Sequence, residues 1–197
     1  MGSTWEMNSV SDELEKQGSV TGGAHNVGKP REIGLGAAPV FQFDEFDCRI
    51  LRSLQDAADQ SMEELAGRVG LSRTPCWRRV KRLEEMGVIV RRVTLLDRER
   101  LGFHVTAFLR VRLKYHDPVT LNRFTSGIQD VKEVIECYST AGDTDFLLHV
   151  IAPNLAEYEE VLRYRIMTLS DICTVNSVIV LKTIKYTTSV PLPGLSR

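Results

Sequence analysis

The hydrophobic period of this chain changes once along its length, and that change constrains the fold more than any other feature. Between residues 43 and 83 apolar residues recur at the three- and four-residue spacing of amphipathic helices, whereas from residue 105 they alternate. A helix and a strand present their side chains with different periods, so the two stretches predict different secondary structure. The length of 197 residues allows two small domains. We therefore expect an α+β chain, helical first and sheet-containing afterwards.

The first 41 residues show neither period. They contain seven of the chain's 14 glycines and carry a net charge of −2. Such a segment cannot bury enough apolar surface to fold alone, which predicts a flexible leader over residues 1–41. The periodic remainder divides into a helical domain over residues 42–95 and a second domain over residues 96–197.

Several classes of protein are excluded by composition. No apolar run approaches the roughly 20 residues of a membrane span, and the N-terminus lacks the apolar core of a secretory signal. We therefore expect no membrane partner and a cytoplasmic location. The cysteines are widely scattered and form no CxxC or Cys/His cluster, so no metal site is expected. They are Cys48, Cys76, Cys137 and Cys173.

Helix signals in the first domain predict three short helices. The first covers residues 44–57 and has apolar residues at helical spacing. Ser61 and Glu64 form a capping box before a second helix, which Gly70 ends. Ser72 is the expected cap of a third helix that runs to Gly87. Two helices joined by a short glycine-containing turn form a helix-turn-helix unit.

The third helix has an apolar face and a basic face. Cys76, Val80 and Leu83 fall together on the core side at 100° per residue. Residues 72–92 contain seven basic and two acidic residues, a local charge of +5, although the whole chain carries only −1. Neutralising phosphates supplies much of the affinity for DNA, and arginines can also bond guanine edges. The candidate DNA-contacting residues are Ser72, Arg73, Thr74, Trp77, Arg78, Lys81 and Arg82.

Two readings of the neighbouring basic residues stay open. A solvated basic helix face is common in proteins of any function, and Arg79, at the edge of the core side, either orients the helix or holds a phosphate. The β-branched run at residues 88–96 predicts a strand. Arg91 and Arg92 on that strand would either contact flanking phosphates as a wing or merely solubilise it.

The second domain alternates strands and helices. Strands are expected over residues 105–114, 134–140, 146–152 and 175–184, with one helix beginning near Pro118 and another capped by Asn154. The resulting order βαββαβ predicts a ferredoxin-like antiparallel sheet with both helices on one face.

Two stretches of the first domain resemble a known protein family. FDEFD at residues 43–47 and LSRTPCWRRVKRLEEMGVI at residues 71–89 resemble the Lrp/AsnC (leucine-responsive, feast/famine) transcription regulators, over residues 43–191. The resemblance implies an N-terminal winged helix-turn-helix domain and an ACT-like, ligand-sensing ferredoxin-like domain. It also implies double-stranded DNA and an amino-acid effector as partners, and a homodimer that assembles to a tetramer or octamer.

The turn at residues 141–145 carries the effector hypothesis. By its chemistry alone it is a tight hairpin turn, because glycine permits positive φ and aspartate bonds nearby backbone. The resemblance implies that it also lies near the effector, where a carboxylate could pair with an ammonium group. The candidate effector-binding residues are Tyr138, Thr140, Gly142, Asp143 and Asp145. Residues 74–77 and 185–192 are similar to the branch of the family that contains the cysteine-detoxification regulator DecR, which implies a sulfur amino acid such as cysteine.

Other functions remain as alternatives. One is an amino-acid-binding module, and another an ACT-like enzyme subunit, in both cases without DNA binding. His104, His116 and His149 belong to no recognisable nucleophile or metal motif. We therefore expect no catalytic residues, no cofactor and no enzyme activity.

Overall fold

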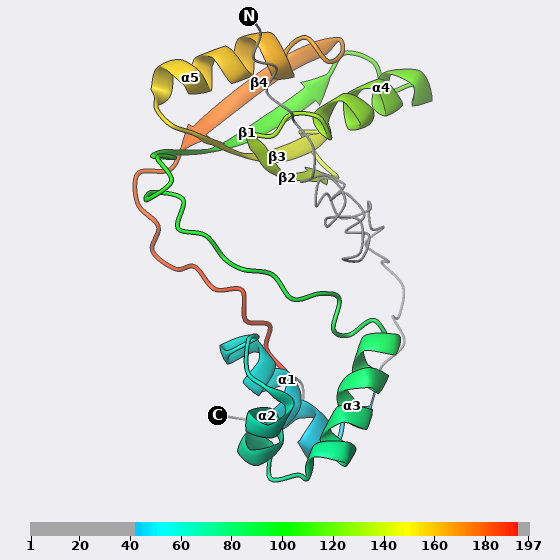
Figure 1. Ribbon diagram of the computed structural model, residues 1–197. Coiled ribbons are helices and arrows are strands. Elements are labelled where there is room, and N and C mark those ends of the chain that lie inside the picture. Colours follow the sequence, from blue (N-terminus) through cyan, green and yellow to red (C-terminus); the bar gives the residue numbers. More distant parts are fainter. Residues whose placement is uncertain (1–41, 193–197) are drawn as a thin grey trace, which may run out of the picture. The chain divides into compact units, whose positions relative to one another are not determined.

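The computed structural model describes residues 42–192, so the leader expected over residues 1–41 lies outside the described residues. The first described elements are three helices, α1 (Glu45–Asp56), α2 (Met62–Val69) and α3 (Arg73–Glu85). They confirm the three helices expected from the sequence (Figure 1).

The ends of these helices follow from local chemistry. Asp44 and Asp47 form a capping box at the start of α1, and Ser61 and Glu64 form the expected one at the start of α2. Gly70 ends α2 with φ +75°, a left-handed conformation that costs a residue with a side chain about 1–2 kcal/mol. Ser72 occupies the cap position of α3, but its side chain makes no capping hydrogen bond there.

One hydrophobic cluster holds the three helices together. Leu65 and Val69 of α2 and Leu83 of α3 are almost completely buried. Cys76 and Val80 are buried as well, which confirms the predicted core face of α3. The cluster comprises Ile50, Leu51, Leu65, Ala66, Val69, Cys76, Val80 and Leu83.

The second domain is a four-stranded antiparallel sheet. Its strands are β1 (Val105–Leu113), β2 (Val134–Ser139), β3 (Phe146–Ala152) and β4 (Ile172–Ile179), in the order β2-β3-β1-β4. The helices α4 (Pro118–Ile128) and α5 (Leu155–Glu160) cover one face (Figure 1). Alternate residues of β1 and β3 pack beneath them in a second cluster, separate from that of the helical domain. The predicted ferredoxin-like order is confirmed.

Two of the expected strands were misjudged. Residues 88–96 form no strand, because they pair with no neighbouring strand in the described chain. β-branched residues favour extended backbone, yet a strand also needs a hydrogen-bonded neighbour, which the sequence pattern cannot supply. β4 spans residues 172–179 rather than 175–184: it pairs with β1 from Leu113↔Ile172 to Ala107↔Ile179, and beyond Ile179 only the Val180 amide still donates to the Thr106 carbonyl of β1.

The second helix of this domain changes its winding. After α5 the chain continues as a π-helix, η1 (Val161–Ile166). Val161 and Ile166, five residues apart, are both buried against the sheet. The sequence pattern predicts one continuous α-helix here, whereas a single π turn is what brings residues with this spacing to one face.

Candidate DNA-binding face and effector site

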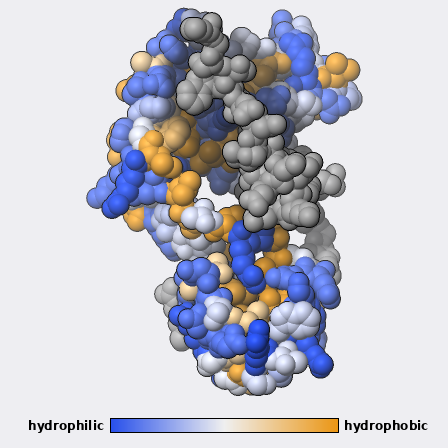
Figure 2. Space-filling view, viewed as in Figure 1, coloured by the Kyte–Doolittle hydropathy of each residue, from blue (hydrophilic) through white to orange (hydrophobic). Residues whose placement is uncertain are grey.

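All seven predicted DNA-contacting residues lie on one exposed side of α3 or at its start. Ser72, Arg73 and Thr74 form the N-terminal edge, and Trp77 leaves half of its surface in solvent. Arg78, Lys81 and Arg82 are exposed further along. Figure 2 shows hydrophilic residues over most of the visible surface of the helical domain. Among the described residues, nothing covers this face along the length of α3.

The basic side chains of this face differ in their partners. Arg73 pairs with Glu63 at 3.0 Å, and Lys81 pairs with Glu84 at 3.1 Å. Both pairs are exposed and therefore weak, so either cation can exchange its carboxylate for a phosphate at little cost. Arg78 has no ion pair or hydrogen bond within residues 42–192. It is the guanidinium with most freedom to bind a base or a phosphate.

Arg82 is held by a buried carboxylate that sequence reasoning missed. Asp47 of α1 leaves only 1% of its side chain exposed, and it accepts from both Arg82 and Arg79 of α3. Half of the Arg82 side chain remains exposed, so part of its bonding capacity is used within the domain and part is free. The signal that could have identified the carboxylate is the spacing of Asp44 and Asp47, which matches a capping box.

Arg79 orients the helix. Its guanidinium donates to Asp44 at 2.6 Å and to Asp47 at 2.8 Å, and it lies 5.5 Å from the ring centre of Phe46. Burial alone would raise the pKa of Asp44, but hydrogen bonds from the Asp47 amide and from Arg79 outweigh it, so the pKa is lowered. The hydrogen bond to Asp44 likewise raises the pKa of Arg79. Of the two predicted roles for Arg79, the structure shows the orienting one.

A shallow hollow of about 340 Å³ lies beside this pair of helices. It is lined by Asp44, Pro75, Arg78, Arg79 and Arg82. Three guanidinium groups against one carboxylate give it a positive character suited to an anion, and arginine binds phosphate through two parallel N–H donors. The hollow thus extends the basic face of α3 towards the start of α1.

The second candidate site is the turn between β2 and β3. Gly142 adopts φ +121°, which confirms that the turn needs a residue without a side chain there. Thr140 donates its hydroxyl proton to the Thr144 carbonyl at 2.7 Å, and its amide donates to the Asp145 carbonyl at 2.9 Å. The predicted tight turn is confirmed.

The two aspartates of this turn have different surroundings. Asp145 accepts from the Leu113 amide at 2.7 Å and lies 2.9 Å from the His116 ring, so it fastens the turn to the end of β1. Asp143 is exposed and has no partner among the described residues. Tyr138, on the neighbouring strand, is 45% exposed; burial and then the nearby Glu136 charge raise its pKa. Asp143 is therefore the carboxylate available to a ligand.

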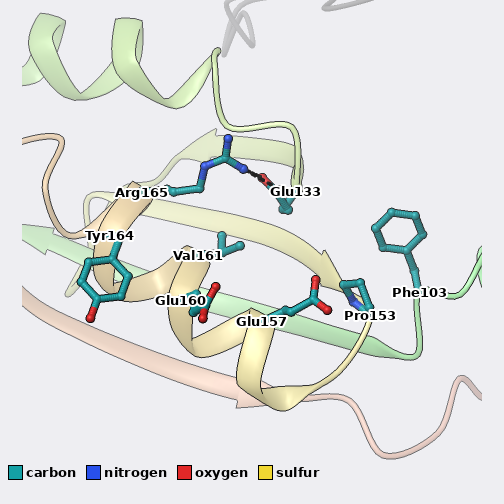
Figure 3. Close-up of a pocket in the computed structure, with 8 residues that line it drawn as sticks. All are labelled: Phe103, Glu133, Pro153, Glu157, Glu160, Val161, Tyr164 and Arg165. Carbon is teal, nitrogen blue, oxygen red and sulfur yellow. Dashed lines mark hydrogen bonds and ion pairs between the residues drawn. The ribbon is translucent and has the colours of Figure 1, made fainter.

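A separate cavity of about 480 Å³ lies beside α5 and η1 (Figure 3). Glu133 and Arg165 form an ion pair at 2.5 Å across it, and Glu157 and Glu160 add two further carboxylates. Tyr164, Val161, Phe103 and Pro153 complete its lining. None of the predicted effector residues lines this cavity, and the sequence pattern gave no signal for it. Its single cation is already paired, which makes it a poor match for the carboxylate of an amino acid.

Two kinds of feature are missing from residues 42–192. No group of three or more metal-binding side chains occurs there. No helix in the same range is long and apolar enough to cross a membrane.

Comparison with known proteins links both domains to one family. Residues 43–90 match a winged helix-turn-helix DNA-binding family, and residues 106–190 match the Lrp/AsnC ligand binding domain. The glutamate uptake regulatory protein of Zymomonas mobilis is 36% identical over 155 residues, which are 79% of this chain and 94% of the relative. The transcriptional activator DecR of Escherichia coli is 34% identical over 149 residues, which are 76% of this chain and 98% of that protein.

A solved structure agrees with these relatives. A transcriptional regulator of Neisseria meningitidis, determined as its L-methionine complex, superposes with a TM-score of 0.74 at 31% identity, covering 77% of this chain and 98% of the other. Its agreement extends over both domains. The chain belongs to the Lrp/AsnC family and is a DNA-binding transcription regulator, not an enzyme.

Proposed function

We propose that this regulator reads double-stranded DNA through the exposed side of α3 and changes its DNA affinity when an amino acid binds near the β2–β3 turn. The observation that carries the proposal is the exposed Arg78, which has no ion-pair or hydrogen-bond partner within residues 42–192 and lies beside the arginine-lined hollow. It supports a protein that binds phosphates along one helix while Thr74 and Trp77 meet base edges. The assignment of residues 42–95 to DNA and residues 96–197 to sensing is supported by the two separate hydrophobic clusters. Its place of action would be the cytoplasm.

The face of the sheet opposite the helices supports a homodimer. Phe108 stacks on His149 with ring centres 4.6 Å apart, and Tyr138 and Val178 are each nearly half exposed there. An exposed apolar surface on one sheet face marks an interaction site. A second copy of this chain would cover it and place two recognition helices on successive half-sites about one helical turn apart. Assembly to a tetramer or octamer belongs to the same proposal.

The effector proposal follows from the turn and from the relatives. An exposed Asp143 carboxylate can bind the ammonium group of an amino acid. Backbone groups of the same turn, near Gly142 and Thr140, would bind the carboxylate of that amino acid. The Neisseria relative was solved with L-methionine, which supports a sulfur amino acid. Methionine and cysteine are the first effectors to test.

DNA binding is tested with a duplex selected from a random-sequence library by the wild-type protein. The double variant Arg78→Ala, Lys81→Ala should bind it about 10- to 100-fold more weakly, because each contact contributes on the order of 1 kcal/mol or more. The slope of log affinity against log salt concentration should become less steep by roughly the amount expected for the loss of two phosphate contacts. The matched control is Lys132→Ala, Arg163→Ala, which removes the same charge from the sensing domain. Equal affinities of the two double variants would overturn the assignment of α3.

A further inference from the structure

The C-terminal segment of the described chain returns to the DNA-binding domain. The side-chain amide of Gln55, on α1, donates to the Val190 carbonyl at 3.2 Å and accepts from the Val190 amide at 2.5 Å. One side chain thus satisfies both backbone groups of one residue, as a neighbouring strand would. The two residues are 135 positions apart in the sequence, so this contact is tertiary.

Leu192 reinforces the contact. It packs, partly buried, against the hydrophobic cluster of the helical domain. Earlier apolar residues of the same segment stay in solvent: Leu181 is 97% exposed and Ile184 84%. The contact with α1 is therefore made by the end of the segment, and residues 181–189 form a bridge between it and β4.

The length of this bridge limits how far the docked end of the segment can lie from β4. Eleven peptide units separate Ile179, the last residue of β4, from Val190, so their separation cannot exceed about 40 Å. The other connection between the domains runs from Ile89, which packs against the helical cluster, to Val105. Its 16 peptide units allow about 58 Å. When docked, the C-terminal segment is thus the shorter of the two connections.

We propose that residues 180–192 are a strap that docks on α1 and restricts the freedom of the DNA-binding domain relative to the sensing domain. The two hydrogen bonds of Gln55 and the packing of Leu192 are the contacts that hold the end of this segment on α1. The inference rests on the proposed function, because the consequence of docking is higher DNA affinity. In the proposed dimer, two DNA-binding domains that are already restrained lose less conformational entropy when they bind the two half-sites.

The strap is suited to opening and closing. Two hydrogen bonds and one partly buried leucine would bind two separate molecules only weakly. Here the segment is covalently attached at β4, which gives it a high effective concentration near α1. Such a contact is readily shifted by a ligand of the sensing domain that binds the docked and undocked states unequally. The strap thus supplies a second connection, besides residues 89–105, through which a change at β4 can reach the DNA-binding domain.

Docking is tested first, by amide hydrogen exchange in the full chain. The Val190 amide should exchange at least about fivefold more slowly than an unstructured amide, and Gln55→Ala should abolish that protection. Gln129→Ala, the same substitution at an exposed glutamine of the sensing domain, is the control and should leave it unchanged. An unprotected Val190 amide in the wild type would overturn the strap.

The consequence of docking is tested with Val190→Pro, which removes the amide donor without altering any residue of the three helices. Affinity for the selected duplex should fall about three- to tenfold, as expected for loss of preorganisation. Ile184→Pro, at an amide with no hydrogen-bond acceptor in the described chain, should stay within about twofold. Protection of Val190 with unchanged DNA affinity of Val190→Pro would reject the strap's role and leave the proposed function intact. Failure of the wild type to bind any duplex would reject both the proposed function and the strap's effect on DNA.

Discussion

The carboxylate of Asp47 accepts a hydrogen bond from Arg79 at 2.8 Å, and it does so with only 1% of its side chain in solvent. Asp47 belongs to the first turn of α1, and Arg79 belongs to α3. Arg82 approaches the other oxygen of the same carboxylate. The orientation of α3 is therefore fixed by a charged contact at the edge of the apolar core as well as by the core itself.

Replacing Asp47 with alanine should destabilise the helical domain by about 2 kcal/mol, because two charged hydrogen bonds are lost at a buried position. Arg79 retains Asp44, which keeps the loss below that of an isolated buried pair. Chemical denaturation followed by circular dichroism measures the change. Glu63→Ala is the control: its pair with Arg73 is exposed on both sides and should contribute less than about 1 kcal/mol. Equal effects of the two substitutions would contradict the role given to Asp47.

Alanine substitutions of Arg78 and Arg82 should both weaken DNA binding but should differ in their effect on thermal stability. Arg78→Ala should weaken DNA binding and leave the melting temperature unchanged, because the side chain has no partner within the described residues. Arg82→Ala should weaken binding and also lower the melting temperature, since it removes a partner of a buried carboxylate. Fluorescence anisotropy and thermal unfolding give the two quantities. A lowered melting temperature for Arg78→Ala would show that it has a structural partner.

The stability of the helical domain should depend on pH through Asp44. Its pKa in the folded state lies below the ordinary value of 3.8, so the unfolded chain takes up the proton first as the pH falls. The stabilisation is complete above that value and is lost as the pH drops through the folded pKa. Asp44→Asn keeps a good capping residue and removes only the charge. The difference in unfolding free energy between wild type and variant should be largest well above pH 3.8 and should disappear once the pH has fallen through the folded-state pKa of Asp44; a difference independent of pH would contradict this account.

The aspartates of the β2–β3 turn should give opposite results. Asp145→Ala should lower the melting temperature, because the Leu113 amide loses its acceptor and the turn loses its attachment to β1. Asp143→Ala should leave stability unchanged and weaken binding of the effector, with L-methionine and L-cysteine as the first ligands. Calorimetric titration and thermal unfolding of the same two proteins distinguish these roles. Unchanged binding by Asp143→Ala would remove that residue from the site.

The helices and most of the strands were predictable because their signals are local. Capping residues and turn glycines such as Ser61 and Gly70 act within a few residues of themselves, and alternation along β1 marks one buried face directly. The face of α3 was predictable for the same reason, since the spacing of Cys76, Val80 and Leu83 fixes which side is buried.

What escaped prediction depends on distant partners. The strand expected at residues 88–96 has the right residue types but no neighbour to pair with among the described residues, and the extent of β4 is set by its register against β1. The pairing of Arg82 with Asp47 joins residues 35 positions apart, so nothing in the sequence near Arg82 reveals it. The cavity beside η1 likewise forms only where helix, loop and strand meet.

The π-helix η1 makes the number of residues after α5 a structural variable in its own right. Because Val161 and Ile166 both face the sheet although five residues separate them, this stretch holds one residue more than a regular helix would need to present the same two side chains. A chain shortened by one residue here would wind as an ordinary α-helix and turn Tyr164 and Arg165 to new directions. The lining of the cavity is therefore governed by the count of residues in this segment, and a deletion would reshape it more than a substitution.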